Sequence, residues 1–599
     1  MKFIKNLYIY SSAPALALLL LTVTYQLWNI DLSKPVFGYG QDSLFHIFVV
    51  KTIINYGWFF QNDLVGFPHH GDSFYLYDFP IHADAFNFFV IKILAFFSHD
   101  SFFITNCFFI LTFAFASLSS FVALRAFNIS ILSALLVSIL YAFLPYHFLR
   151  NVWHLFLSNY SAIPLTIMVS LWIAQDKIQL ISINQKNQYC LSPNRFFWIS
   201  LLVALFAATN GIYYAFYSII LFIFAWFICA IREGKFLNHN LLTSLTLSLI
   251  IIFTLLALYI PSFIYWMNSG MNNFVANRHQ SDSEYHALKI IDLFMPVSNH
   301  YLEYLRNLRA AFSEAVVGGE RGAEGLGILA ASGFMFLLLW IIAKTQNGEN
   351  GFLQKTINKL SLSKSEENLI SNLASLNLLS VLFATAGGLV MFIVLPFPLL
   401  RSHARFCIFI AFFSLFIIAI IFDKVAQKKL IAKIAIVAVA VLALFDQVGD
   451  IKYARSEAIV KMQKNFDIDA DFVKNVETNL APNSQVFVLP VFGFPEDGGD
   501  EYESLVLYLH SKNIGWSYPS IMGRASSLWQ KKVVKFEDKN FIKAVKEAGF
   551  SGVVIDRYHF ARNEKNNDWS KLRKLELALK AVSKSQINSR DGRLVFFNL

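Results

Sequence analysis

The sequence predicts a mainly α-helical polytopic membrane protein that carries a small C-terminal α/β domain on the exterior side. Three observations predict this fold class. The 599 residues are 56% hydrophobic with a mean hydropathy of +0.50, and only 15% are charged, whereas a soluble domain has about 25%. Apolar runs of spanning length recur as far as residue 447. After residue 448 charge rises and the apolar runs shorten, so 1–447 is the expected membrane domain and 448–599 the soluble one.

A spanning helix needs about 20 apolar residues, and the sequence offers twelve candidate runs. They lie near 8–28, 81–97, 102–124, 129–145, 159–176, 196–210, 212–231, 241–264, 325–344, 373–398, 405–423 and 432–447. Basic clusters in the connecting segments are mutually consistent with a cytoplasmic side, which places the C-terminal domain outside. Twelve spans would leave that domain inside. We therefore expect eleven or thirteen spans, with 81–97 partly interfacial or an extra crossing within 101–145.

Composition also excludes some function classes. Much of the +10 net charge lies in the loops expected in the cytoplasm, so nucleic acid is not an expected partner. The four cysteines lie in or beside apolar runs without metal-ligand spacing, and 448–599 contains none, so no disulfide framework is expected.

The exterior loop at 29–80 is rich in carboxylates and imidazoles. A helix that begins near Asp42 would place Asp42 and His46 on one face. An ionised Asp42 at a helix N-terminus could accept a proton from a hydroxyl or hold a metal ion, or simply cap an interfacial helix. The His69-His70-Gly71-Asp72 cluster, with Asp78, lacks a strict metal spacing, so solvated loop residues are the favoured interpretation.

Two further segments contain positive charge at expected exterior positions. His147, Arg150 and His154 recur at i, i+3 and i+7, which predicts one helix face suited to a phosphate; the alternative is an aromatic-belt anchor. Arg401 and Arg405 lie in a short turn where the orientation rule disfavours positive residues. An anionic lipid phosphate explains them slightly better than snorkelling to the headgroups does.

The second exterior loop, 265–322, ends in a glycine-rich stretch from Gly318 to Gly327. This stretch lacks the strand and the Lys-Ser/Thr ending of a phosphate loop, which predicts a flexible lead-in to the next span. In the C-terminal domain we expect strands at 484–491, 552–556 and 594–599, and amphipathic helices at 538–549 and 570–584.

Taken together, these segments resemble the GT-C superfamily of polytopic membrane glycosyltransferases, and in particular a poorly characterised bacterial subgroup. The subgroup resemblance is carried by short stretches: 145–154, 210–214, 284–300, 401–406, 508–511 and 523–524. Asp42 matches the position of the first-loop catalytic aspartate, and Arg401 and Arg405 look like arginines that hold donor phosphate. The chain departs from the family because no adjacent acidic pair is present, since Gln41 precedes Asp42.

The resemblance implies an inverting sugar transferase in the bacterial inner membrane, with its C-terminal domain in the periplasm. The donor would be a polyprenyl-phosphate-linked sugar and the acceptor an envelope glycan or lipid, with membrane lipids around the spans and, where a cofactor is used, a divalent Mg²⁺ or Mn²⁺. The implied catalytic residues are Asp42, His46 and Glu284. The residues implied to bind the donor phosphate are Arg401, Arg405, Arg150 and His147. The residues implied to bind the acceptor or to supply a second carboxylate are Asp78, Arg278, His279 and His300.

Two other functions share this architecture. A transporter or flippase of lipid-linked sugars predicts internal repeats and charged residues near mid-membrane. No repeat relates the two halves and the polar groups cluster at one surface, which favours an enzyme. A non-catalytic assembly protein, whose exterior domain binds glycan or a partner, stays open on sequence alone.

Overall fold

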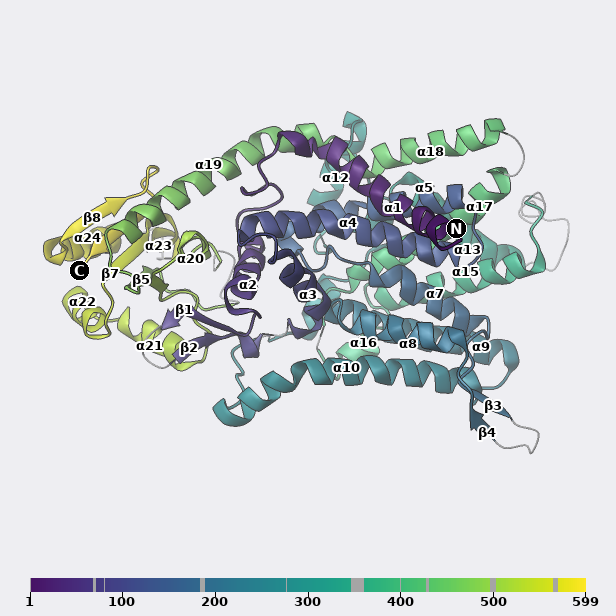
Figure 1. Cartoon of the computed structure of the whole chain (residues 1–599), viewed down its shortest axis with the longest axis horizontal. Coiled ribbons are helices and arrows are strands. Elements are labelled where there is room, and N and C mark those ends of the chain that lie inside the picture. Colours follow the sequence, from purple (N-terminus) through teal and green to yellow (C-terminus); the bar gives the residue numbers. More distant parts are fainter. Residues whose placement is uncertain are drawn as a thin grey trace.

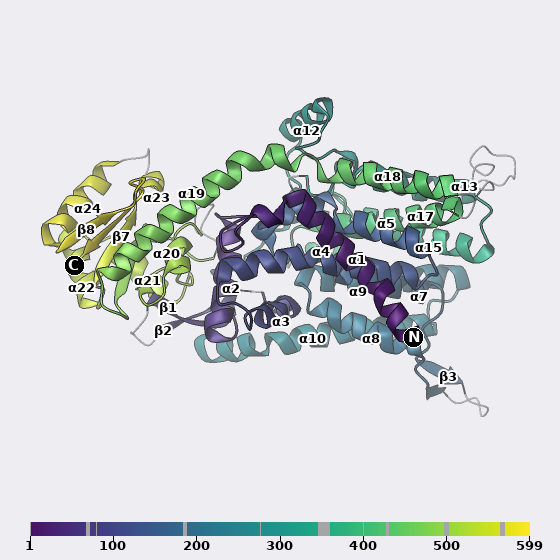
Figure 2. The ribbon, with the colours of Figure 1, turned by 45° about the horizontal axis from the view of Figure 1, so that its top comes forward.

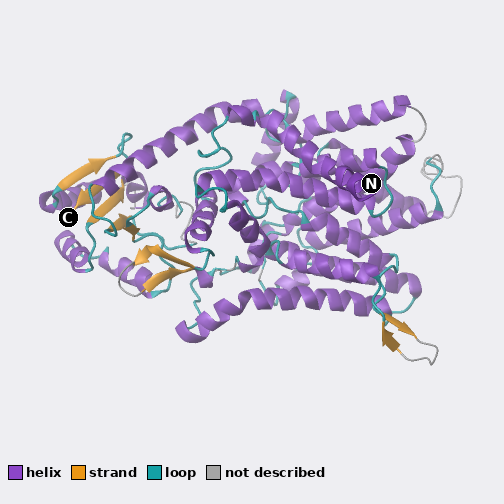
Figure 3. Cartoon of the chain, viewed as in Figure 1, coloured by secondary structure: helices purple, strands orange, loops and turns teal. Residues whose placement is uncertain are grey.

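The computed structural model describes residues 2–67, 72–79, 81–183, 189–275, 277–320, 322–345, 360–398, 400–426, 430–495, 502–563 and 569–599. A long bundle of helices carries a mixed α/β domain at one end (Figures 1 and 3). The N-terminus lies at the far end of the bundle and the C-terminus lies in the α/β domain (Figures 1 and 2). The predicted fold class, mainly helical with a small C-terminal α/β domain, is therefore confirmed.

Eight helical segments among the described residues are long and apolar enough to cross a membrane, so the chain is a multi-pass membrane protein. They are formed by α1 (Lys2–Tyr25), α4 (Ser101–Arg125), α5 (Ile131–Ala142) with α6 (Pro145–Arg150), α9 (Ile212–Glu233), α10 (His239–Ser269), α13 (Ile328–Thr345), α17 (Cys407–Ala426) and α18 (Leu430–Val448). Three further helices pack among them: α7 (Ala162–Ala174), α8 (Arg195–Ala208) and α15 (Lys364–Ala384).

With those three, eleven helical segments of the described residues pack in the bundle; eight of them are long and apolar enough to cross a membrane, so the expected count of eleven or thirteen spans stays a prediction. The run at 81–97 forms only the ten-residue α3 (Ala85–Leu94). This helix lies with α2 (Asp42–Tyr56) at the end of the bundle that faces the α/β domain (Figure 1).

The α/β domain is built on a seven-stranded sheet of order β2-β1-β6-β5-β7-β9-β8. The predicted strands are β5 (Gln485–Leu489), β7 (Gly552–Asp556) and β9 (Leu594–Asn598), and the predicted helices are α22 (Asp538–Glu547) and α24 (Trp569–Val582). β6 (Gly515–Trp516) and β8 (Ser585–Asn588) complete the strands of this domain. A 28-residue helix, α19 (Ile451–Thr478), connects the sheet to the bundle (Figure 2).

Alternation along the buried strands gives the sheet two apolar faces. Val486 and Val488 of β5 belong to the large core shared with the bundle and the first loop. Phe487 and Leu489, which point the other way, pack into a second core under α22 and α24. One face of the domain is therefore continuous with the membrane domain.

The first loop supplies the remaining two strands of this sheet. β1 (Gln61–Phe67) pairs with β2 (Asp72–Tyr75) as an antiparallel hairpin, and Val65 of β1 pairs in parallel with Trp516 of β6. The sheet thus crosses the boundary expected at residue 448, because residues 61–75 of the membrane domain complete it. The first loop and the C-terminal domain form one structural unit.

Candidate functional site

Asp42 is the first residue of α2, as the sequence predicts, and its side chain is 45% exposed. The chain enters this helix through Gly40 at φ 146° and Gln41 at φ 46°, ψ −134°. Its carboxylate lies at a helix N-terminus, where the backbone N–H groups stabilise negative charge. Asp42 therefore offers an accessible carboxylate oxygen at the membrane-domain surface.

His46 lies one turn further along α2, where its ring is bonded to the main chain of Asp42. Its Nδ1 is 2.7 Å from the Asp42 main-chain oxygen, and its ring packs edge-on against Phe156 at 5.0 Å. Burial lowers the pKa of His46 to about 4. The imidazole is consequently a neutral group that fixes the first turn of α2.

The Asp42 carboxylate faces His154, whose Nε2 lies 3.6 Å from Asp42 Oδ2. Burial, reinforced by the guanidiniums of Arg150 and Arg405, holds the pKa of His154 well below its usual range. His154 is therefore neutral. Its Nδ1 is buried without a hydrogen-bond partner among the described residues.

The predicted single helix face of His147, Arg150 and His154 is wrong. Helix α6 ends at Arg150, and a separate 3-10 turn, η4, covers Val152–His154. Between them Asn151 adopts φ 32°, and its Oδ1 accepts the Trp153 N–H at 2.8 Å. Because the Asn151 side chain caps the next turn, the chain bends here.

A buried ion-pair cluster lies beside His154. Glu320 bridges the guanidiniums of Arg150 and Arg405, the latter with Nε 3.3 Å from Glu320 Oε1. The three side chains are 5%, 9% and 6% exposed for Arg150, Arg405 and Glu320. Burial pushes the pKa of Glu320 upward, but the two arginines outweigh it and hold the pKa below its ordinary value. Two guanidiniums thus share one bridging carboxylate.

The glycine-rich stretch from Gly318 to Gly327 positions Glu320, so its interpretation as a mere lead-in is wrong. Gly318 has φ 82°, and a Cβ there would lie 2.2 Å from the Tyr285 carbonyl oxygen. Buried Glu324 accepts the N–H groups of Glu320 at 2.5 Å and of Gly322 at 3.0 Å. Glycines permit this close packing, and Glu324 fixes the turn that presents Glu320.

Aromatic rings support both arginines of the cluster. The Arg405 guanidinium lies 4.3 Å from the centre of the Tyr213 ring, and that of Arg150 lies 4.9 Å from the centre of the Tyr146 ring. Tyr214 donates a 2.5 Å hydrogen bond to the Leu157 carbonyl, which fixes the start of α9. The stretch at 210–214 thus supports Arg405 by a cation–π contact.

Sequence reasoning assigned His147 to the donor phosphate, but the structure places it in the core. It is fully buried, with Nε2 2.8 Å from Thr112 Oγ1 and Nδ1 2.8 Å from the Ala142 carbonyl oxygen. Its ring stacks on Phe113 at 3.6 Å. Both nitrogens are occupied, so His147 has no free group for a phosphate.

Asp78 and His300 also have structural partners. Arg524 donates to both carboxylate oxygens of Asp78 at 2.7 and 2.8 Å, and Trp266 and Asn272 occupy the same two oxygens. His300 Nε2 lies 3.2 Å from Asp446 Oδ1, and its Nδ1 accepts the Leu302 N–H. A saturated carboxylate and a doubly bonded imidazole hold the fold together rather than react.

The remaining predicted residues lie on the second exterior loop and the 400–405 turn. Exposed Glu284 accepts the Gly387 N–H at 3.0 Å, and His279 caps α11 (Gln280–Tyr285). Arg278 donates to the Asn277 carbonyl. Arg401 is half-buried, and its charge acts on His286. The segment around His286 lies against the 400–405 turn, which contains Arg405, because the Ala404 N–H donates a hydrogen bond to the His286 carbonyl.

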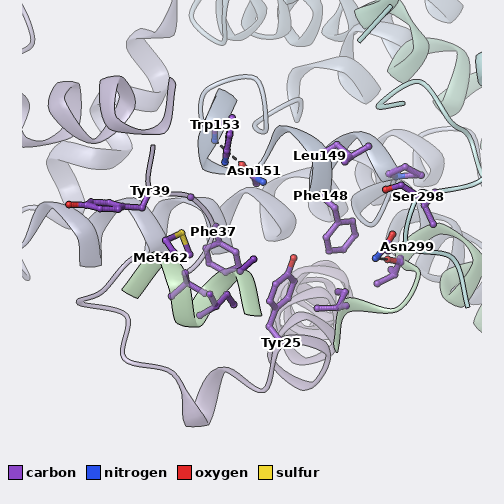
Figure 4. Close-up of a pocket in the computed structure, with 18 of the residues that line it drawn as sticks. Tyr25, Phe37, Tyr39, Phe148, Leu149, Asn151, Trp153, Ser298, Asn299 and Met462 are labelled. Carbon is purple, nitrogen blue, oxygen red and sulfur yellow. Dashed lines mark hydrogen bonds between the residues drawn. The ribbon is translucent and has the colours of Figure 1, made fainter. Parts of the chain in front are cut away.

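A cavity of about 520 Å³ opens beside the bend at Asn151 (Figure 4). Tyr25, Phe37, Phe148 and Leu149 give it apolar walls, and Asn151, Ser298 and Asn299 add polar groups. It lies where the ends of α1, α6 and α18 meet the start of α19. Asn151 and Trp153 line the cavity, whereas Arg150, Arg405 and Glu320 are not among its lining residues.

The residues that the structure describes do not provide a set of ligands for a metal ion. Among them no group of three or more His, Cys, Asp or Glu side chains is placed to hold one. Asp42 has a single imidazole beside it, and Asp78 is saturated by other partners. His69 and His70 lie outside the described residues. No step of the chemistry proposed here is assigned to a metal.

Comparison with known proteins gives structural likenesses only. No protein-family model and no curated protein matches the sequence. The chain is similar to the oligosaccharyltransferase AglB of Archaeoglobus fulgidus in complex with an inhibitory peptide and a dolichol-phosphate, at 11% identity and a TM-score of 0.43, over 99% of this chain and 74% of that one. A form of the Archaeoglobus fulgidus enzyme with Zn and sulfate matches at 12% identity and TM-score 0.42, over 98% and 73%.

A third solved structure is ArnT from Cupriavidus metallidurans bound to undecaprenyl phosphate. It matches at 9% identity and a TM-score of 0.40, over 98% of both chains. At TM-scores below 0.5 these likenesses do not decide the reaction, which the chemistry of the site itself must indicate.

Proposed function

We propose that the chain is a GT-C-type membrane glycosyltransferase that moves a sugar from a polyprenyl-phosphate donor to a cell-envelope acceptor. The reaction would occur at the membrane face that carries the C-terminal domain, the periplasmic face of a bacterial inner membrane. One observation carries the proposal: the accessible Asp42 carboxylate adjoins, through His154, a buried cluster in which two guanidiniums share one bridging carboxylate. A base that accepts the acceptor proton and arginines that bind phosphate, both at the end of a membrane bundle, suit the transfer of a sugar from a lipid-phosphate donor.

In the proposed step, Asp42 accepts the proton of an acceptor hydroxyl while that oxygen bonds to the anomeric carbon of the donor sugar. The bond between this carbon and the phosphate oxygen breaks, and its electron pair leaves with the polyprenyl phosphate. Attack from the opposite side inverts the anomeric centre. General-base catalysis of this kind contributes about 10²–10⁴-fold to the rate.

Arg150 and Arg405 would stabilise the charge that develops on the leaving phosphate. Glu320 keeps both guanidiniums paired and oriented, and Arg150 Nε is buried without a hydrogen-bond partner among the described residues. Arg401, which is half-buried at the neighbouring turn, would meet the phosphate from the solvent side. Charge-assisted bonds to phosphate are about twice as strong as neutral ones.

Transfer from a radiolabelled polyprenyl-phosphate sugar to an envelope extract, measured with purified protein, tests the proposal. We expect wild-type protein to transfer label, Asp42→Ala and Arg405→Ala to lose at least about 100-fold of the rate, and Asp63→Ala to match wild type. Asp63 is the matched control because it is an exposed aspartate of the same loop. Intact transfer in the Asp42 and Arg405 variants would refute the site. If no donor were turned over, the non-catalytic assembly role would be favoured.

A further inference from the structure

The turn that leads into Asp42 is bonded to the C-terminal domain on both sides of Gly40. On one side, Glu503 Oε1 accepts the Gln41 N–H at 2.9 Å, although the two residues are 462 positions apart. On the other side, the Tyr39 hydroxyl donates to Asp469 Oδ2 at 2.8 Å and lies 2.9 Å from His510 Nε2. The residues that precede Asp42 are therefore held from outside the membrane domain.

The hydrogen bond from Tyr39 to Asp469 connects this turn to the sheet. Asp469 pairs with Arg593, and Arg593 Nη1 reaches Asp556 Oδ2 at 2.6 Å, at the end of β7. Asp469 and Asp556 are buried. This network is rigid support, because buried charges of this kind are costly to separate.

The backbone at Gly40 and Gln41 needs such support. Gln41 has φ 46° and ψ −134°, outside the regions that side-chain-bearing residues usually adopt. Gly40 has φ 146°, and a Cβ there would lie 3.4 Å from Glu503 Oε1. Sparsely populated conformations persist only where the surroundings over-determine them. Glu503 is the described side chain bonded to the strained Gln41 amide.

We propose that Glu503 is a positioning residue, whose carboxylate fixes the Gly40–Gln41 turn and thereby aims the Asp42 carboxylate at the acceptor. The inference rests on the proposed role of Asp42 as the base. It gives the C-terminal domain a part in catalysis, in addition to any part in covering the site.

Glu503 can be removed without detaching the domain, because a separate contact holds α2 to α20 (Leu505–His510). Lys51 of α2 donates to the carbonyls of Tyr508, Leu509 and Ser511 at 2.7, 3.0 and 2.6 Å. These carbonyls are at the C-terminal end of α20, where a cation is favoured. A Glu503 variant should therefore fold and keep its docked domain.

The test compares Glu503→Ala with Glu503→Gln in the full chain. Glutamine keeps an oxygen that can accept the Gln41 N–H, and alanine does not. We expect Glu503→Ala to lower kcat about tenfold with the donor KM within about twofold, since a hydrogen bond to a charged group is lost. Glu503→Gln should keep at least about half of kcat on the same argument. Glu547→Ala, on an exposed residue of α22, is the control.

A second measurement does not depend on activity. Amide hydrogen exchange of residues 38–45 should rise about tenfold in Glu503→Ala, stay near wild type in Glu503→Gln, and leave the 552–556 strand unchanged in both. Unchanged exchange at 38–45 in Glu503→Ala would overturn the inference, and so would faster exchange with an unaltered kcat. A wild-type protein that transfers no sugar would instead refute the proposed function, and the exchange result would still decide whether Glu503 holds the turn.

Discussion

Arg405 and Glu320 form a buried ion pair, with Arg405 Nε 3.3 Å from Glu320 Oε1, although 85 residues separate them in the chain. Arg150 binds the other carboxylate oxygen of Glu320. This arrangement changes the meaning of the positive charge that the sequence places outside the membrane. Arg150 and Arg405 do not snorkel to lipid headgroups, because Glu320 holds both of them in a buried cluster; Arg401 lies outside this cluster.

Removal of Glu320 should be far more damaging than loss of a surface carboxylate. In Glu320→Ala two buried guanidiniums lose the carboxylate that bridges them, and breaking a buried pair costs about 3–5 kcal/mol. We expect a lower midpoint in thermal unfolding and no transfer activity. Glu314→Ala, on the exposed face of α12 (Glu303–Ala315), is the control and should change neither quantity. Equal unfolding midpoints for the two variants would show that the cluster does not stabilise the fold.

His147 should prove to be a stability residue with no part in donor binding. His147→Ala removes a buried ring stacked on Phe113 and its contact with the Thr112 hydroxyl. A cavity left by a large buried side chain costs about 2–5 kcal/mol. We expect reduced thermal stability and an unchanged donor KM in the folded fraction. A KM raised tenfold at unchanged stability would restore the phosphate role that the sequence suggested.

Features that depend on local sequence could be predicted, whereas contacts between residues far apart in the chain could not. The start of α2 at Asp42 and the apolar runs are local signals, so they were predictable from composition and spacing. Glu320 carried no local signal, because it lies in a glycine-rich loop and acquires its partners only in the folded chain. The β1–β6 pairing of Val65 with Trp516 was equally hidden, since it joins distant segments. A buried partner for each exterior arginine was the physical requirement that could have pointed to Glu320.

Arg524 should connect the first loop to the C-terminal domain at a measurable cost. Its two bonds to Asp78 reach a carboxylate that is 1% exposed, and Arg524→Ala leaves that charge buried. We expect a loss of about 3–5 kcal/mol in unfolding free energy, together with faster limited proteolysis at the junction of the two parts.

The control for this prediction is Arg590→Ala. Arg590 pairs with Asp471 on the surface, where the two side chains are 74% and 42% exposed, and such pairs contribute about 0–1 kcal/mol. Similar losses for both variants would mean that the Asp78 contact does not join the domains.

Stability should fall as the pH drops below about 6.5, because buried imidazoles resist protonation in the folded chain. Burial lowers the pKa of His46 to about 4, and burial together with Lys51 lowers that of His510 to about 3. An unfolded imidazole titrates near 6.5. Between that value and about 4 the unfolded chain binds more protons than the folded one, so stability is present above pH 6.5 and is lost on acidification. Thermal midpoints at pH 7.5 and 5.0 measure this. His510→Gln should reduce the pH dependence of the thermal midpoint. The control, His99→Gln at an exposed position, should leave it unchanged. A wild-type midpoint that does not change with pH would contradict the buried neutral state of these imidazoles.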